Sequence, residues 1–221
     1  MRILFVLAAL FTLAAAPPAR DWRTTAVTTP SGSFAIGNPA APVKLVEYLS
    51  FTCPHCGHFV AESKTALHDG WVRNGSVRVE TRAAMRDAYD VAAWTVARCA
   101  GPARFDRLSR AIFAQQDVWT TRGSTWAQAN LAKLKAMPER AQVRAIADNS
   151  GLSAIAARTG LTPAALTACL ATDVQRKQLM AMTDAAFAKI PGTPGFEING
   201  ALVEGFDWAT LEPQLRAAGA R

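Results

Sequence analysis

Hydrophobic and polar positions along the chain predict strands near its two ends. The run V-K-L-V-E-Y-L-S-F at positions 43–51 is rich in β-formers and mostly apolar, which is typical of a strand buried on both faces. Residues 77–81 alternate apolar and polar side chains and predict a second long strand. Shorter strands are expected at 33–36, 196–199 and 202–203, with helices from Cys53 to about Leu67 and from Asp207 to Ala218.

The long middle of the chain, from about Asp87 to Lys189, has an almost wholly helical pattern and is rich in alanine, the strongest helix former. Thr162-Pro163 is a good helix start, because the hydroxyl can cap the helix and proline suits its first turn. Asn199-Gly200 is a hairpin turn signal between the last two strands. Breaks between successive helices are expected at Gly101-Pro102, Gly123, Pro138, Gly151 and Gly160.

The order of these elements is strand, strand, helix, strand, a helical block, then strand, strand and helix. The early and late parts can share one sheet only if the helical block between them is an insertion. The sequence therefore predicts an α/β domain that is discontinuous, formed by residues 33–85 and 190–221. The residues between, 86–189, are expected to form an all-helical insertion domain.

The first residues of the chain indicate export. Met1-Arg2 is followed by an apolar run to Leu13 and by the small residues Ala14-Ala15-Ala16, which is the pattern of a secretory signal peptide. The run is shorter than the roughly 20 residues of a membrane span, and an uncleaved anchor is the alternative. We expect a signal peptide at 1–19, a flexible polar lead-in at 20–32, and export to an oxidising compartment, which the family resemblance given below implies is the periplasm.

Composition and charge narrow the class of protein. Half of the 221 residues are hydrophobic and 19% are charged, which excludes a disordered chain. The formal charge is +7, but the 24 lysines and arginines are scattered singly along the chain. Because nucleic-acid binders usually gather such charges in a stripe or tail, we expect no nucleic-acid partner.

Two of the four cysteines belong to the motif Cys53-Pro54-His55-Cys56, which follows the buried strand directly and opens a helix. The free N–H groups of a helix N-terminus stabilise a thiolate, so we expect a lowered pKa at Cys53. His55 can stabilise that thiolate by charge or hydrogen bonding, and Pro54 suits the first helical turn. Cys56 lies one turn along and is close enough to act as the resolving thiol. This context favours redox catalysis.

Other interpretations of the motif fit less well. A zinc ribbon needs a second close pair of ligands, whereas Cys99 and Cys169 stand far apart. A c-type haem site needs histidine directly after the second cysteine, where this chain has Gly57. A purely structural disulfide across so small a loop would be strained and would gain little entropy. We expect no cofactor and no metal site, and we place His58 and His68 on the surface or in a groove.

Two stretches of the sequence resemble the periplasmic DsbA-type thiol:disulfide oxidoreductases. One runs from Gly37-Asn38-Pro39 to the C-P-H-C motif, and the other is G-T-P-G-F-E-I-N-G at positions 192–200. The resemblance covers nearly the whole chain after the expected signal peptide. It implies a thioredoxin-like fold with an inserted all-helical domain, and C-P-H-C is typical of the strongly oxidising members.

The resemblance also implies roles for three further residues. Pro194 matches the cis-proline beside the active-site disulfide, which would leave the backbone of Thr193 free to pair with an extended substrate next to Cys53. Glu47 matches an acidic residue beneath the active site. A buried carboxyl group with a raised pKa could take the proton of Cys56 as this thiol attacks a mixed disulfide. The alternative is a glutamate that faces solvent at a strand edge.

The second cysteine pair is expected to be structural. Cys99 and Cys169 both fall near helix ends in the inserted block, and two cysteines left over in an exported protein favour a disulfide. Closing a loop of about 70 residues stabilises a fold by roughly 4 kcal/mol on the chain-entropy model. The alternative is a pair of buried, reduced thiols.

Together these observations predict a thiol:disulfide oxidoreductase that donates its Cys53–Cys56 disulfide to reduced exported proteins and is reoxidised by a membrane partner. The family's best-known oxidases have valine where this chain has Thr193, and threonine also occurs in isomerase-like and reductase-like relatives. An isomerase or reductase kept reduced is thus the main alternative, and a thiol-based metal-handling or binding module is another. Isomerases of this class carry an extra N-terminal dimerisation domain, whereas a short lead-in precedes Ser33, which favours a monomer.

Overall fold

The computed structural model describes residues 20–221, so the expected signal peptide lies outside the described residues. Their six strands form one mixed sheet in the order β1-β2-β4-β3-β5-β6. β3 and β4 are parallel, and the other neighbouring strands are antiparallel. The strands are β1 (Ala26–Thr28), β2 (Phe34–Ile36), β3 (Val43–Leu49), β4 (Val77–Ala83), β5 (Gly195–Ile198) and β6 (Ala201–Val203).

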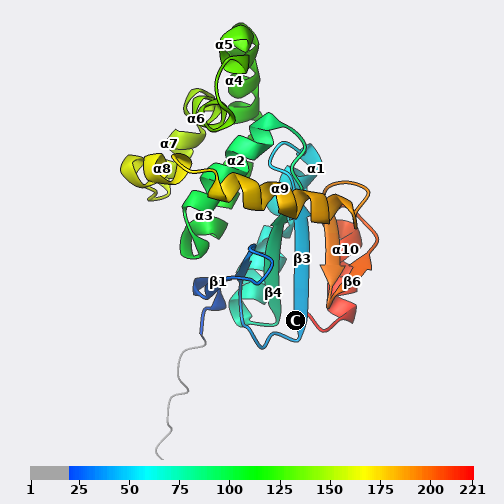
Figure 1. The fold of residues 1–221 in the computed structure, drawn as a ribbon. Coiled ribbons are helices and arrows are strands. Elements are labelled where there is room, and N and C mark those ends of the chain that lie inside the picture. The colour runs from blue at the N-terminus through cyan, green and yellow to red at the C-terminus, as the bar shows by residue number, and fades with distance from the viewer. Residues whose placement is uncertain (1–19) are drawn as a thin grey trace, which may run out of the picture.

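Helices pack on both faces of the sheet. The parallel strands β3 and β4 are connected by α1 (Pro54–Ser63), which continues into the π-helix η2 (Lys64–Val72). On the opposite face, α9 (Val174–Phe187) crosses in front of β3 and β4 (Figure 1). The last helix, α10 (Trp208–Ala217), lies beside β6.

Between β4 and β5 the chain leaves the sheet and forms the helical insertion, most of which stacks above the sheet in Figure 1. The α/β fold with an inserted helical block is therefore confirmed. Besides α9, the insertion contains α2 (Ala88–Cys99), α3 (Pro102–Phe113), α4 (Gln116–Ala129), α5 (Leu131–Lys135), α6 (Glu139–Ser150), α7 (Leu152–Arg158) and α8 (Pro163–Leu170).

Side chains of β3 alternate between two cores, as the period of a strand requires. Leu45 and Leu49 belong to the large core, which extends from the sheet into the insertion. Val46 and Tyr48 belong to a small core under α9. Glu47 shares the direction of Leu45 and Leu49, so β3 points this carboxyl group into the side of the sheet that α1 and η2 cover.

The expectation of a flexible lead-in at 20–32 is wrong. Residues Trp22–Thr24 form a 3₁₀ turn, and β1 pairs with β2 at the edge of the sheet. Arg23 anchors the segment through an ion pair with Asp69 of η2, at 2.8 Å. The segment reads as polar because an edge strand buries little side-chain surface, while its backbone is fixed by hydrogen bonds to its neighbour.

Gly123 does not break a helix, in contrast to the prediction, but lies inside α4. A Cβ atom at this position would lie 3.1 Å from Cβ of Ser150 in α6, so glycine permits the close approach of the two helices. The predicted turn at Asn199-Gly200 is confirmed, with φ angles of 52° and 87° between β5 and β6.

Cys99 and Cys169 are joined by a disulfide, with an S–S distance of 2.03 Å and Cα atoms 5.8 Å apart. The bond connects the end of α2 to α8 and so closes the insertion on itself. Within residues 20–221, every helix is too short or too polar to cross a membrane.

Candidate active site

The cysteine motif stands where β3 ends and the first covering helix begins. Cys53 is the N-cap residue of α1, and Pro54 occupies its first turn, where no N–H group is needed. Cys53 is 3% exposed and Cys56 is fully buried one turn further along. Both are free thiols, so the structure describes the reduced pair.

The two thiols have opposite acidities. The pKa of Cys53 is lowered to about 4, first because the Cys56 thiol donates a hydrogen bond to the Cys53 sulfur. Hydrogen bonds from the Thr193 side chain and from the backbone N–H groups of Cys56 and His55 lower the pKa further, whereas burial raises it. The pKa of Cys56 is raised far above its usual range, chiefly by burial. At neutral pH the pair is therefore a thiolate at Cys53 and a thiol at Cys56, and the thiolate is the nucleophile of disulfide exchange.

The loop before β5 faces the reactive sulfur. The Thr193–Pro194 peptide bond is cis, the form that the family resemblance implies. The carbonyl oxygen of Thr193 lies 3.2 Å from Sγ of Cys53 and accepts a hydrogen bond from the thiol form. The structure therefore brings Thr193 and Pro194 to the cysteine pair from a position far along the chain.

His55 is exposed, and its ring packs edge-on against Phe206 with the centroids 6.0 Å apart. The backbone N–H of His55 supports the Cys53 thiolate. The structure thus turns the imidazole of His55 toward the surface beside the site.

Glu47 is 7% exposed, which confirms the expected burial and excludes the solvent-facing alternative. Burial raises its pKa to about 7, against a lowering effect of the positive charge on Arg110. The residue borders a cavity of about 20 Å³ between the sheet, α1, η2 and α3. Glu47 is therefore a buried acid that titrates near neutral pH.

Two residues of the insertion hold the active-site loop and were not identified from the sequence. Asp90 of α2 is fully buried and accepts hydrogen bonds from the backbone N–H groups of Phe51, at 2.8 Å, and Arg86, at 3.0 Å. Burial raises its pKa to about 7. Gln116 of α4 donates its amide hydrogens to the carbonyl oxygens of Phe51, at 2.8 Å, and Cys53, at 2.9 Å.

The sequence contains a pattern that could have identified Asp90, but none for Gln116. Asp90 interrupts the otherwise apolar stretch of α2, and a lone acid among apolar residues marks a buried polar contact. Gln116 has no such signal, because a glutamine at the start of a helix is ordinary.

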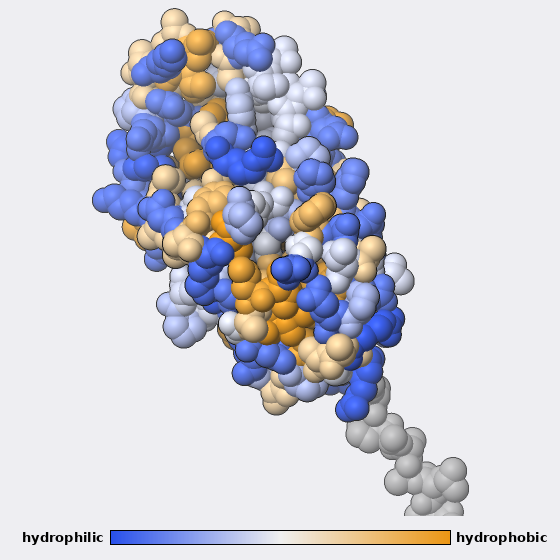
Figure 2. Space-filling view, turned by 90° about the vertical axis from the view of Figure 1, so that its right-hand side faces the viewer, coloured by the Kyte–Doolittle hydropathy of each residue, from blue (hydrophilic) through white to orange (hydrophobic). Residues whose placement is uncertain are grey.

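An apolar groove opens beside the cysteine pair. Its volume is about 480 Å³, and Figure 2 shows hydrophobic residues gathered on the side of the molecule that carries β6 and α10. Two large apolar side chains on its wall are well exposed, Leu202 at 52% and Phe206 at 61%. Its other walls include His55, Ile190, Thr193, Pro194 and Val203.

Within the part of the chain that the structure describes, no group of three or more histidine, cysteine, aspartate or glutamate side chains is arranged as metal ligands would be.

The chain matches the family model described as thioredoxin over residues 29–217. It therefore belongs to the thioredoxin family. Its sheet, with the helical insertion between β4 and β5, is that of the DsbA-like disulfide oxidoreductases within this family.

Individual relatives agree with this placement. The crystal structure of a protein-disulfide isomerase from Novosphingobium aromaticivorans is 35% identical, with a TM-score of 0.75, and the match covers 83% of this chain and 95% of that one. Wolbachia pipientis alpha-DsbA1 is 19% identical, with a TM-score of 0.67, over 86% of this chain and 92% of that one; it shows the same fold.

A curated relative from Rickettsia typhi, named as a protein-disulfide oxidoreductase, is 28% identical over 195 residues. The match covers 84% of this chain and 64% of the relative. The chain thus spans a little under two thirds of the length of this curated relative.

Proposed function

We propose that this chain is a thiol:disulfide oxidoreductase that introduces disulfides into exported proteins through the Cys53–Cys56 pair. The observation that carries the proposal is the placement of Cys53 at the N-terminus of α1, with the buried Cys56 thiol one turn along, an arrangement that lowers the pKa of Cys53 to about 4. A thiolate this stable is a good leaving group and stabilises the reduced form of the pair, which makes the Cys53–Cys56 disulfide a strong oxidant.

The exchange has two steps. A substrate thiolate attacks Sγ of Cys53, the Cys53–Cys56 bond breaks, and the Cys56 sulfur takes the electron pair and then a proton. A second substrate thiolate attacks the substrate sulfur of the mixed disulfide, and Cys53 leaves as a thiolate. The substrate is oxidised by two electrons and the Cys53–Cys56 pair is reduced by two.

The surroundings of Cys53 support a protein substrate. The carbonyl of Thr193 lies beside the sulfur and can pair with an extended chain, while the groove along Leu202 and Phe206 accepts apolar side chains. Reduced, unfolded proteins expose both an extended backbone and apolar side chains. We therefore propose reduced exported proteins as substrates, a membrane partner for reoxidation, a periplasmic location that follows from the expected signal peptide, and a monomer.

Two observations favour a second candidate, an isomerase or reductase that is kept reduced. Thr193 stands where the best-known oxidases of the family that this sequence resembles have valine, and the Novosphingobium relative described above is a protein-disulfide isomerase. The two functions use the same residues and differ in the redox state in which the cell holds the pair.

The reduction potential of Cys53–Cys56, measured by equilibration with glutathione, separates the two candidates. We expect a value above about −180 mV, with the pair oxidised in cells by thiol trapping. A value near about −270 mV, as in thioredoxin, or a pair that is reduced in cells, would favour the reductase or isomerase. The variant Cys53→Ser must lose activity, and retention of activity by it would overturn catalysis by this pair.

A further inference from the structure

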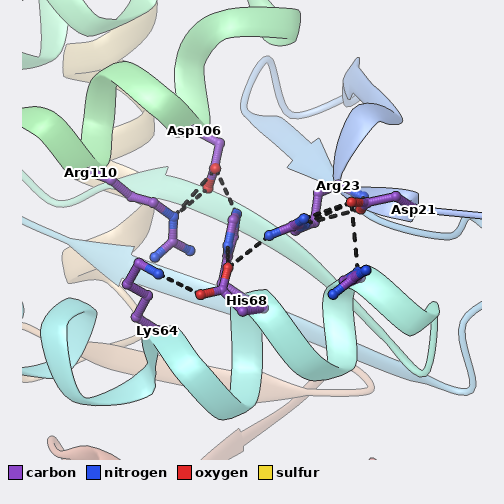
Figure 3. Close-up of polar contacts among 8 residues, drawn as sticks. Asp21, Arg23, Lys64, His68, Asp106 and Arg110 are labelled. Carbon is purple, nitrogen blue, oxygen red and sulfur yellow. Dashed lines mark hydrogen bonds and ion pairs between the residues drawn. The ribbon is translucent and has the colours of Figure 1, made fainter.

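A polar cluster joins α3 of the insertion to η2 (Figure 3). His68 of η2 lies between two aspartates, with Nδ1 3.0 Å from Oδ1 of Asp69 and Nε2 2.8 Å from Oδ2 of Asp106 in α3. Arg110, one turn further along α3, donates from Nε to Asp106 at 3.1 Å. The sequence placed His68 on the surface or in a groove; its side chain is only 12% exposed and lines an internal cavity.

Both aspartates are ionised at neutral pH. The pKa of Asp69 is lowered below its usual range, first because Lys64 donates a hydrogen bond to it and next because His68 does. Burial raises the pKa of Asp106, but the hydrogen bond from His68 and the charge of Arg110 outweigh it, so the pKa is lowered overall. An ionised carboxylate only accepts hydrogen bonds.

Each ring nitrogen of His68 therefore faces an acceptor, and both contacts are hydrogen bonds only when the ring is an imidazolium. An imidazole held between two acceptors can release a proton from one nitrogen and take up another at the second. The ring of His68 thus connects Asp106 on its inner side to Asp69 on its outer side.

The inner side of the cluster reaches Glu47. His68, Asp106 and Arg110 line the same cavity of about 20 Å³ that Glu47 borders, and such a volume holds about one water molecule. The walls that α1, β2 and β4 contribute are Val60, Ile36, Val79 and Thr81, none of which titrates.

The outer side of the cluster reaches solvent. The side chain of Asp69 is 31% exposed and also contacts Arg23, at 2.8 Å, and Lys64. A series of proton-carrying groups therefore runs to the surface from Glu47, which is buried under α1 beside Val60, one turn of that helix after Cys56.

We propose that His68 conducts protons between Glu47 and solvent during disulfide exchange, an inference that rests on the proposed function. When the Cys53–Cys56 bond opens, the Cys56 sulfur takes a proton from Glu47. Glu47 recovers one through a water molecule in the cavity from Asp106, which takes it from Nε2 of His68. Nδ1 of His68 then takes up a proton from solvent by way of Asp69. When the bond re-forms, one proton passes outward along the same groups. His68 acts through Glu47 and does not touch the reacting sulfurs.

The experiment measures the reaction of each thiol separately. The reduced full chain is mixed with oxidised glutathione and quenched in acid, which gives the rate of mixed-disulfide formation at Cys53 and the rate of its resolution by Cys56. In His68→Gln we expect resolution to slow about tenfold, since a positioned proton carrier contributes a factor of this order or more. Formation is expected to stay unchanged, because Cys53 is already a thiolate. The matched control is His58→Gln, an exposed histidine of α1.

A purely structural role of the cluster predicts a different pattern. Added imidazole should restore resolution in His68→Ala if the residue carries protons. The effect of His68→Gln should also vanish in a Glu47→Gln background, because the two residues act in series. If both rates fall together, if resolution is unchanged, or if imidazole has no effect, the proposal is overturned.

Asp106→Asn provides a second variant if His68→Gln does not fold, and the same slowing of resolution is expected of it. Failure of the proposed function itself has a separate signature. A reduction potential near that of thioredoxin would exclude the oxidase while the two rates stay measurable, and a chain without exchange activity would form no mixed disulfide at Cys53 even in the wild type.

Discussion

The side-chain amide of Gln116 is hydrogen-bonded to the carbonyl oxygen of Cys53, with Nε2 and O 2.9 Å apart. The same nitrogen donates to the carbonyl of Phe51, so that the first residue of an insertion helix holds both ends of the loop that leads into the cysteine motif. Asp90 holds the N–H side of the same loop. The insertion therefore positions the reactive sulfur directly.

Replacing Gln116 by alanine removes two hydrogen bonds, to the carbonyl groups of Phe51 and Cys53. We expect the free energy of unfolding to fall by about 2 kcal/mol, at roughly 1 kcal/mol for each bond. Urea denaturation of the reduced protein measures this loss. Gln128→Ala, an exposed glutamine on the same helix, is the control and should change stability little. Equal effects of the two variants would contradict a specific role of Gln116.

The ionisation of Cys53 depends on its neighbour. Because the Cys56 thiol is the main hydrogen-bond donor to the Cys53 sulfur, Cys56→Ala should raise the pKa of Cys53 clearly above its value of about 4. Cys56→Ser keeps a donor and should raise it less. Thiolate absorbance near 240 nm, recorded against pH, measures each value. Indistinguishable curves for the two variants would show that the hydrogen bond from Cys56 is not the cause.

The same pKa makes the stability of the reduced protein depend on pH. The folded pKa of Cys53 lies near 4, below the unfolded value of about 8.5, so the unfolded state binds the extra proton between these pH values. The stabilisation by the thiolate is complete above about pH 8.5 and is lost as the pH falls toward 4. Denaturation of the reduced form, compared with the oxidised form as control, should show this loss, since the oxidised pair does not titrate.

Glu47 changes stability with pH in the opposite direction to Cys53. Burial raises its folded pKa to about 7, so the unfolded state releases this proton first and the wild-type protein loses stability as the pH rises from about 4 to 7. The free energy of unfolding of Glu47→Gln minus that of the wild type should therefore be larger at pH 8 than at pH 4, by up to about 3 kcal/mol. Urea denaturation at the two pH values tests it. A difference that does not change with pH would mean that Glu47 ionises normally in the folded protein.

The Cys99–Cys169 disulfide closes a loop across a sequence separation of 70 residues. Replacing both cysteines by alanine should lower the free energy of unfolding by roughly 4 kcal/mol, because the unfolded chain regains the entropy that the loop removes. Exchange at Cys53 should be unaffected under conditions where the variant is folded, and glutathione kinetics provide that control. Loss of exchange in a folded variant would give the bond a role beyond stability.

The sequence predicted the elements that depend on local pattern. The strand at 43–49 and the cysteine motif are adjacent, so the hydrophobic run and the helix start that follow each other in the chain locate Cys53 at a helix N-terminus. The turn at Asn199-Gly200 is likewise a property of two neighbouring residues.

Residues that act across the fold were not predictable in this way. His68 meets Asp106 from another helix, and Gln116 meets Cys53 from beyond the end of the sheet. In spacing and in type, these residues are like those on the exposed face of any helix. The order of the segment at 22–28 was missed for a related reason, because backbone pairing leaves no mark on the polarity of an edge strand.

The contacts of Asp90 and Gln116 also limit how the protein can be cut. A chain shortened to the sheet, with β4 joined directly to β5, would keep both cysteines and the strands beside them. The loop from Phe51 to Cys53 would then lose its hydrogen bonds to Asp90 and Gln116, and the Cys53 carbonyl would keep only the bond from the N–H of Gly57. Such a minimal version is expected to fold around a misplaced sulfur, so exchange at Cys53 should require the insertion as well as the sheet.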